Sequence, residues 1–382
     1  MNRLKFKHIS LACLLALTVF ACSKKKGTDQ PEEGGKPGVD RKALLTYLAD
    51  DIIIPSYANF KTKLDLLQGK SDAFTAAPTT ASLVELRTAW VNAYVEWQKI
   101  ELIDVGPASS QTLRAFFNVY PTNVANINSG IANGTVNFDL PATYAQQGFP
   151  ALDYLINGLA NNDTDIVTFY STAADAAKRI AYVKKILTEM NSIFAKVYTP
   201  WTTGVYRDEF ISKSGTDASS SLAGLVNGYV SNYERYIRSG KFGIPSGSMI
   251  NGVVSAEKVE ALYKKDISLT LAKTAQQASV DFFNGKSVKT RTEGSSFKTY
   301  LDALGANDSK TNVKLTHAIQ DQLGVTLTKL NLLTENLNNE VKNNNQKMID
   351  VYTEMQKFVR MVKVDMTSAM SITITYTDND GD

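Results

Sequence analysis

Apolar residues recur every three or four positions along much of this chain, which is the spacing of one face of an α-helix. Long stripes of this kind run through residues 83–97, 152–159, 180–190, 323–337 and 349–366. Segments rich in glycine, proline, serine and asparagine separate the stripes, and such segments end helices. The pattern predicts an all-α protein that is built from antiparallel helix pairs.

The chain is long enough for two packed units. Its 382 residues exceed what one hydrophobic core comfortably organises. A stretch rich in serine and glycine, Ser212–Ser221, separates two halves of similar length. We therefore predict two four-helix-bundle-like lobes packed side by side, residues 41–211 and 212–382. Only Ile372–Tyr376 alternates like a strand, so a short C-terminal strand is expected.

The N-terminus has the composition of an export signal. Basic residues precede an apolar run that is too short to span a bilayer, and Ala21 and Cys22 follow it. Because Val19–Cys22 fits a bacterial lipobox, we expect residues 1–21 to be removed and Cys22 to be lipidated. Residues 22–40 would then form a flexible tether. A plain secretory signal with an incidental cysteine is the alternative.

These features predict a lipid-anchored protein of the cell envelope. Ser23 follows the cysteine, which favours the outer membrane and leaves the face of the membrane open. The formal charge of +3 falls near zero once the three basic residues of the signal are removed. Nothing in this balance indicates nucleic-acid binding. The expected partners are the membrane, through the lipid anchor, and an unidentified small ligand, peptide or iron species.

Histidine is almost absent from the sequence. It occurs only at His8, which lies in the signal, and at His317, while the two cysteines are Cys13 and Cys22. Transition-metal peptidase sites draw on imidazole or thiolate ligands, so the usual zinc site is not expected. The sequence also lacks HExxH, Gly-x-Ser-x-Gly and Walker-type motifs.

Glu101 shares a helical face with two tryptophans. Relative to Trp90, Trp97 lies at about −20° and Glu101 at about +20° on a helix with 100° per residue. A buried carboxylate must be paired, hydrogen-bonded or bound to a ligand. Because Gly106 follows shortly, Glu101 could instead lie in the last turn and reach solvent. The sequence leaves both alternatives open.

Three further segments carry polar groups, and each segment has two possible interpretations. In Gly148–Tyr154, Asp153 sits near the start of a predicted helix, where helix initiation alone also explains it. Arg235 and Arg238 are three residues apart and either hold an anion or form surface ion pairs. The tail Asp378–Asp382 resembles the beginning of a calcium loop but lacks a later bidentate glutamate, so a solvated acidic tail is the other reading.

Taken together, these segments resemble the imelysin family, which includes insulin-cleaving membrane proteases and iron-regulated periplasmic proteins. The resemblance is strongest to lipoprotein members from Bacteroidetes and covers most of the mature chain. It is carried by Trp90–Glu101 with Gly106-Pro107, by Gly148–Tyr154, by Arg238–Pro245, and by Lys363–Ala369 with the acidic tail.

The resemblance implies an all-α fold of two lobes, with a functional cleft near a GxHxxE motif at a helix start. In this sequence Gly148 is kept, Pro150 replaces the histidine and Asp153 replaces the glutamate. The side chain of proline offers no donor or acceptor, so a metal site that uses this histidine cannot form. The candidate ligand-binding residues are Glu101, Gly148, Asp153, Arg235 and Arg238. Glu101 and Asp153 are also candidate metal ligands, and no catalytic residue is assigned.

A non-catalytic ligand-binding lipoprotein is the favoured function, because a polar cleft needs only shape, arginines and carboxylates. The alternatives are a metallopeptidase with a carboxylate-based site and a structural or interaction lipoprotein with a vestigial cleft. Carboxylates suit hard or labile ions better than hydrolytic zinc. The resemblance also implies a link to iron acquisition. Iron, with oxygen ligands such as Glu101, Asp153, Tyr154 and Tyr233, is therefore the candidate metal, and zinc is not expected.

Overall fold

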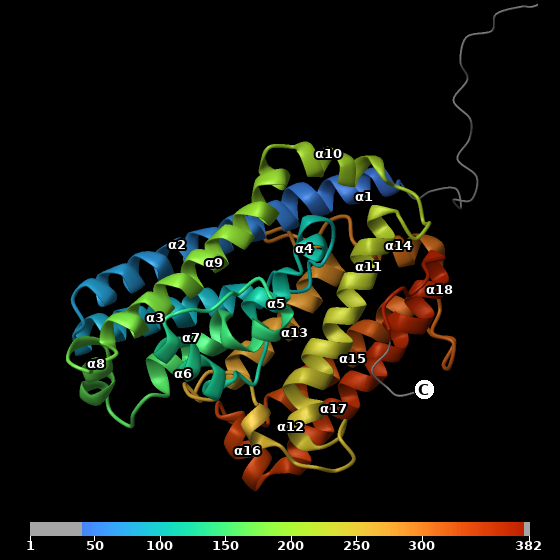
Figure 1. Ribbon diagram of the computed structural model, residues 1–382. Helices are drawn as coiled ribbons and strands as arrows, with labels where there is room; N and C mark the ends of the chain where they lie inside the picture. Colours follow the sequence, from blue (N-terminus) through green and yellow to red (C-terminus); the bar gives the residue numbers. More distant parts are fainter. Residues whose placement is uncertain (1–39, 378–382) are drawn as a thin grey trace, which may run out of the picture. The chain divides into compact units, whose positions relative to one another are not determined.

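The computed structural model describes residues 40–377, and this part of the chain is all-α (Figure 1). All of it belongs to one compact unit.

The elements before residue 220 are α1 (Arg41–Tyr47), η1 (Leu48–Ile53), α2 (Ile54–Ala76), α3 (Thr80–Trp97), α4 (Pro107–Ser110), α5 (Leu113–Phe117), α6 (Val124–Asn133), η2 (Pro141–Gln146), α7 (Gly148–Asn157), α8 (Asp163–Ser171), α9 (Ala176–Thr202) and α10 (Val205–Ser212). Those after it are α11 (Ser221–Ser231), η3 (Asn232–Gly243), α12 (Ile244–Ser246), η4 (Ala256–Lys258), α13 (Ser268–Asn284), α14 (Phe297–Leu304), α15 (Leu315–Leu330), α16 (Leu337–Asn343), α17 (Asn345–Arg360), η5 (Met361–Met366) and α18 (Thr367–Met370). The all-α prediction is confirmed, and the division into two lobes stays a prediction.

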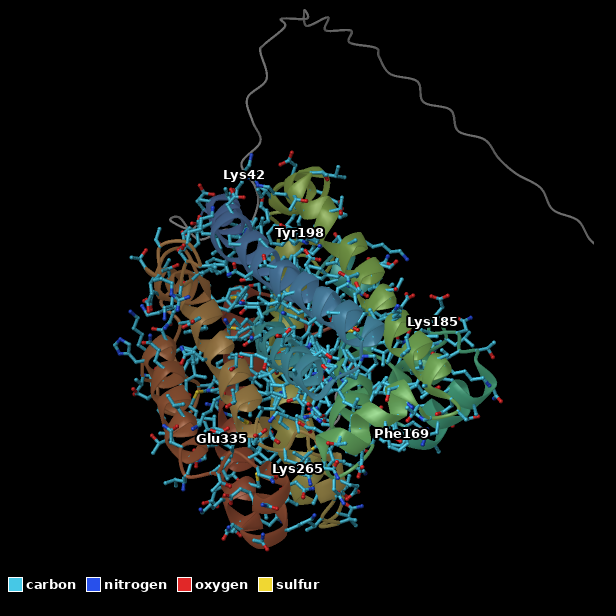
Figure 2. The ribbon with its side chains drawn as sticks, turned by 90° about the vertical axis from the view of Figure 1, so that its left-hand side faces the viewer. Lys42, Phe169, Lys185, Tyr198, Lys265 and Glu335 are labelled. Atoms are coloured by element: carbon cyan, nitrogen blue, oxygen red, sulfur yellow. The ribbon has the colours of Figure 1, made fainter. Side chains whose placement is uncertain are left out.

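Helices α2, α3 and α9 form the core of the first half. α2 packs against both α3 and α9, and Figure 2 looks onto α2 with α9 beside it. Thr79 caps α3 through a capping box: its hydroxyl accepts from the Ser82 N–H at 3.1 Å, and the Ser82 hydroxyl accepts from the Thr79 N–H at 3.1 Å. Aromatic rings pack edge to face inside, with the Phe60 centroid 4.8 Å from that of Phe194 and 5.7 Å from that of Trp97. These contacts fix the C-terminal end of α3.

Helices η3, α13, α15 and α17 form the core of the second half. η3 is π-helical and continues directly from α11. It packs against α17 and α13, and α17 packs against α15. Contacts between α13 and α3 join this group to the first one. A π-helix is a rare form that is often found at functional sites. The candidates Arg235 and Arg238 lie on it.

The predicted stripes at 83–97, 180–190 and 349–366 lie within helices. The prediction that the stripe at 323–337 lies in one continuous helix is wrong, because α15 ends at Leu330 and α16 begins only at Leu337. Leu332, between them, is 56% exposed. Asn336 caps α16 by accepting from the Asn339 N–H at 3.2 Å. Asparagine side chains favour such caps over helix interiors, which explains the break.

The predicted strand at Ile372–Tyr376 is also wrong. No residue of this segment is in a strand, and its backbone pairs instead with one side chain of α11. Asn227 donates from Nδ2 to the Thr373 carbonyl at 3.0 Å, and its Oδ1 accepts from the Thr375 N–H at 2.8 Å. In this helical surrounding, an amide side chain supplies the donor and the acceptor that a neighbouring strand would otherwise offer.

The two ends of the chain, residues 1–39 and 378–382, lie outside the described residues. The export signal, the lipidation of Cys22, most of the tether and the calcium-loop-like tail therefore stay predictions. Within residues 40–377, no helix is both long enough and apolar enough to cross a membrane.

Candidate functional site

Gly148 begins α7 in a conformation that side chains rarely adopt, with φ +72°. A Cβ atom at this position would lie 2.4 Å from the Phe117 carbonyl oxygen of α5. Pro150 follows in the first turn and is buried. The carbonyl of Phe149 accepts a hydrogen bond from Trp90 Nε1 at 3.2 Å. Glycine is thus required here by the close approach of α5 to α7, independently of any ligand.

Asp153 is 1% exposed and holds a loop against α7. Its Oδ2 accepts from the Tyr263 N–H at 2.9 Å, and its Oδ1 accepts from the Lys264 N–H at 2.9 Å and from Asn157 Nδ2 at 3.0 Å. Burial raises the pKa of Asp153 to about 7, against the lowering effect of these three donors. The carboxylate is therefore occupied by the loop that follows η4.

Very little space remains beside the two candidate carboxylates. The cavity between Tyr120, Pro150, Asp153 and Tyr263 has a volume of about 20 Å³. The one beside Glu101 has a volume of about 10 Å³. A volume of this size holds about one water molecule. Neither space admits a peptide or an organic ligand.

Glu101 lies just beyond the end of α3 and is buried, which answers the question that the sequence left open. Its Oε1 lies 3.0 Å from Arg114 Nε and accepts from Asn118 Nδ2 at 3.1 Å. The guanidinium of Arg114 in turn lies 3.4 Å from the centroid of the Tyr236 ring of η3. Glu101 thus joins the end of α3 to α5 and, through Arg114, to the π-helix.

Glu260, which no sequence pattern singled out, is at the centre of a buried polar network. It is 2% exposed and accepts from Tyr94 Oη at 3.0 Å, Gln98 Nε2 at 3.1 Å, Asn118 Nδ2 at 2.8 Å and the Lys241 ammonium. Burial acts to raise the pKa of Glu260, but the charge of Lys241 and these donors outweigh it and hold the pKa below its usual value. Glu260 and Lys241 therefore form a buried ion pair within a hydrogen-bonded network.

Arg238 is 0% exposed and lies inside the protein. It donates from Nε to the Glu234 carbonyl at 3.3 Å and from an Nη atom to Ser239 Oγ at 3.2 Å, and its guanidinium lies 5.3 Å from the centroid of the Tyr352 ring. The guanidinium of Arg235 lies 5.9 Å from the Tyr376 ring instead. The structure thus places the two arginines over different rings.

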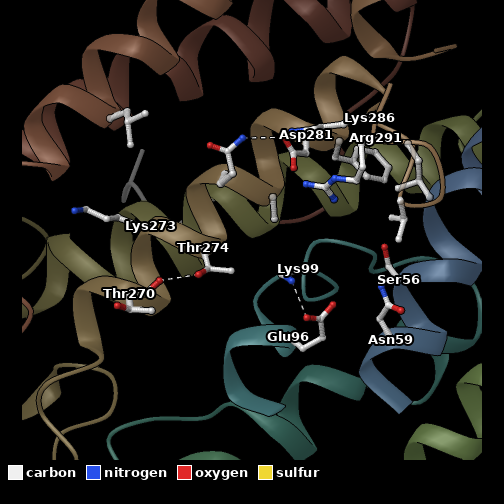
Figure 3. A pocket seen from close by; sticks show the side chains of 16 residues that line it. Ser56, Asn59, Glu96, Lys99, Thr270, Lys273, Thr274, Asp281, Lys286 and Arg291 are labelled. Carbon is white, nitrogen blue, oxygen red and sulfur yellow. Dashed lines mark hydrogen bonds and ion pairs between the residues drawn. The ribbon is translucent and has the colours of Figure 1, made fainter. Parts of the chain in front are cut away.

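An open cavity of about 520 Å³ lies elsewhere, between α2, the end of α3 and α13 (Figure 3). We call it the α2–α13 cavity. Ser56 and Asn59 line it from α2, Glu96 and Lys99 from the end of α3, and Thr274 from α13. A volume in the range of 300–1,000 Å³ is typical of small-molecule sites.

Basic side chains outnumber acidic ones in the α2–α13 cavity. The charged groups that line it are Lys99, Lys273, Lys286, Arg291, Glu96 and Asp281. Lys99 lies 2.7 Å from Glu96 and Lys286 lies 3.4 Å from Asp281. Among residues 40–377, Lys273 and Arg291 form no ion pair. The lining therefore carries a positive excess that the protein itself does not balance.

Comparison with known proteins decides the family. The sequence model of the imelysin family matches residues 53–359, which is most of the chain. The chain belongs to the imelysin family. Iron-regulated protein A of Synechococcus elongatus is 24% identical over 151 residues, an alignment that spans 39% of this chain and 38% of that protein.

Two crystal structures show that this imelysin fold is shared. An imelysin-like protein from Psychrobacter arcticum matches with a TM-score of 0.66 at 19% identity, and a candidate iron-regulated protein A precursor from Parabacteroides distasonis matches with a TM-score of 0.69 at 18% identity. Each alignment covers 88% of this chain and 97% of the other. The resemblance inferred from the sequence is confirmed.

The motif of this imelysin does not fit a metal that is bound through a histidine. Pro150 stands at the histidine position, and both carboxylate oxygens of Asp153 accept backbone N–H groups. Within residues 40–377, no group of three or more His, Cys, Asp or Glu residues is arranged to hold a metal ion. A shared metal site of Glu101 and Asp153 stays a prediction, and the geometry around each favours a structural role.

The sequence did not indicate the α2–α13 cavity, and none of the predicted site residues lines it. Leu327 was assigned to an apolar stripe, yet it is 38% exposed and lines the cavity. Glu96 of α3, a carboxylate, is 8% exposed at the cavity wall. An apolar residue that remains exposed beside unpaired basic groups is the signal of such a site, but it becomes visible only in three dimensions.

Proposed function

We propose that this imelysin-family protein is a lipid-anchored protein of the cell envelope that binds a small ligand in the α2–α13 cavity and has no peptidase activity. The observation that carries the proposal is the difference in volume between two cavities. About 520 Å³ is open at the α2–α13 cavity, whereas about 20 Å³ is left at the family motif. A ligand-binding protein needs an open cavity such as the α2–α13 cavity. A peptidase of this family would need open space at the motif.

The chemistry at the motif supports the non-catalytic part of the proposal. Hydrolysis of a peptide bond needs an activated water or a nucleophile near the scissile carbonyl. Pro150 supplies neither, and Asp153 is buried under the loop at Tyr263. The side chains of the motif region therefore hold the fold together.

The names of two relatives support a link to iron. Both are iron-regulated protein A or its precursor, and neither name states a ligand. We include an iron species among the ligands to be tested. Export and lipidation of Cys22 complete the proposal and are tested by metabolic labelling with palmitate, which Cys22→Ala should abolish.

The functional test uses a cavity-filling variant. Thr274 of α13 is half-buried and points into the cavity in Figure 3, so Thr274→Trp should fill it. Thr353→Trp on the exposed side of α17 is the matched control. A small-molecule library, with Fe(III)-citrate and iron-free citrate included, is screened by thermal shift and calorimetry. Ligands should stabilise the wild type and the control, and should fail to stabilise Thr274→Trp.

Peptidase activity is measured in parallel by mass spectrometry with unfolded protein substrates, with and without added Fe(II) or Zn(II). We expect no cleavage. Cleavage that is lost in Asp153→Asn would overturn the proposal in favour of a metallopeptidase. Stabilisation by a ligand that is equal in Thr274→Trp and in the wild type would move the binding site elsewhere.

A further inference from the structure

The α2–α13 cavity combines unpaired cations with an apolar wall. Arg291 and Lys273 line it and have no ion-pair partner among residues 40–377. Figure 3 shows the guanidinium of Arg291 on one wall and the ammonium of Lys99, which is paired with Glu96, on another. An unbalanced positive charge beside a partly desolvated space attracts an anion more strongly than it would in open water.

Hydrogen bonds within its loop fix the backbone of Arg291. The residue adopts φ +64°, in a turn where its N–H donates to the Ser287 carbonyl at 3.0 Å. The Val288 N–H of the same turn donates to the Asp51 carbonyl of η1 at 2.9 Å. The turn is thus attached to η1, which contributes Ile52 to the wall of the cavity. The side chain of Arg291 is exposed at the cavity, and its guanidinium can offer a planar pair of donors to a carboxylate or a phosphate.

Polar donors and apolar groups complete the lining. Ser56 is 7% exposed and its hydroxyl has no hydrogen bond among the described residues, so it can donate to a ligand. Ile52, Phe282 and Leu327 form apolar parts of the wall, and Leu327 is 38% exposed. A ligand that matches both surfaces has a charged end and an apolar body.

We propose that the α2–α13 cavity binds an organic anion, a carboxylate or phosphate on an apolar body, with Arg291 as its principal counter-ion and Lys99 and Lys273 as secondary ones. This inference rests on the proposed binding function and adds the chemical class of the ligand. It requires no metal and no catalysis.

The experiment uses the full chain, purified in detergent, and calorimetry with three probes of similar shape. These are 1-naphthoate, 1-naphthyl phosphate and the neutral 1-naphthamide. We expect saturable binding of one or both anions, and affinity for the amide that is weaker by about tenfold or more. A preference for naphthyl phosphate over naphthoate would identify a phosphate ligand, and the reverse preference a carboxylate.

Two variants of one loop provide the matched control. Arg291→Gln should weaken binding of the anions roughly tenfold and leave the amide unchanged. Lys289→Gln removes the same charge two residues away, at an exposed position that does not line the cavity, and should change the affinity by less than about twofold. Folding of both variants is checked by circular dichroism.

The outcomes separate the two proposals. Equal binding of the amide and the anions, lost in Thr274→Trp, would overturn the anion class and leave the cavity as a binding site. Equal effects of Arg291→Gln and Lys289→Gln would show that general surface charge attracts the probe, and would also overturn the specific role of Arg291. No binding of any probe would overturn the anion class for ligands of this shape, and the library screen with Thr274→Trp then decides the binding function separately.

Discussion

Removing the negative charge of Glu260 should strongly destabilise the protein. Glu260→Gln keeps the size of the side chain and takes away the countercharge of Lys241, whose side chain is 2% exposed. Lys241 also donates to Gln98 Oε1 at 2.8 Å, which does not neutralise it. The variant thus leaves a buried cation with neutral partners only.

The expected loss of unfolding free energy is about 3–5 kcal/mol, because breaking a buried ion pair leaves one charge desolvated and unpaired. Globular proteins have total stabilities of about 5–15 kcal/mol, so the loss is a large fraction of the whole. Lys241→Met together with Glu260→Gln removes both charges. The double variant should regain about 2 kcal/mol or more relative to Glu260→Gln, since coupled neighbours deviate from additivity by this order.

The assay is urea unfolding at pH 7, followed by far-UV circular dichroism and by tryptophan fluorescence, whose agreement tests two-state behaviour. Glu85→Gln is the control, because Glu85 pairs with Lys70 at 2.8 Å on the surface and such pairs contribute about 0–1 kcal/mol. A loss below about 1 kcal/mol for Glu260→Gln, or a double variant less stable than Glu260→Gln, would refute the reasoning.

Three further predictions follow from single contacts. Gly148→Ala should cost about 2 kcal/mol or more in urea unfolding, because its Cβ would lie 2.4 Å from the Phe117 carbonyl oxygen at a positive φ; wild-type stability would contradict this. The pKa of Asp153 is about 7 in the fold and 3.8 by its usual value, so the folded state binds one more proton between these pH values. Stability should therefore fall by up to about 4 kcal/mol as pH rises from about 4 to 7, and Asp153→Asn should flatten that slope. Asn227→Ala should increase hydrogen exchange at the Thr375 N–H, which it holds at 2.8 Å, and an unchanged rate would show that other contacts fix this segment.

The fold was predictable because the signal for helices is local. Stripes with a spacing of three and four specify where a helix lies, and α3, α9 and α17 follow them. The two wrong predictions, the continuous helix over 323–337 and the strand at 372–376, have local causes. The spacing of apolar residues does not reveal these causes. Asn336 starts a new helix inside an apolar stripe, and Asn227 takes the place of a neighbouring strand for the backbone at Thr373.

The candidate site was only partly predictable. The angle of Glu101 to Trp90 made burial one of two alternatives, and contacts with Arg114 and Asn118, beyond the end of α3, decide for burial. Glu260 could not be found in this way, because its partners come from α3, from Asn118 just after α5, and from η3, which are distant in the sequence. The α2–α13 cavity likewise depends on a turn at Arg291 and on the packing of α13 against α3. Such long-range proximity leaves no periodic trace in the chain.

The central claim is that ligands bind in the α2–α13 cavity and not at the family motif. The most direct test is the dissociation constant of 1-naphthoate for the wild type, Thr274→Trp and Asp153→Asn, measured by calorimetry under one condition. The account predicts saturable binding to the wild type and to Asp153→Asn, and none to Thr274→Trp. Binding that is retained in Thr274→Trp and lost in Asp153→Asn would contradict it and place the ligand at the motif.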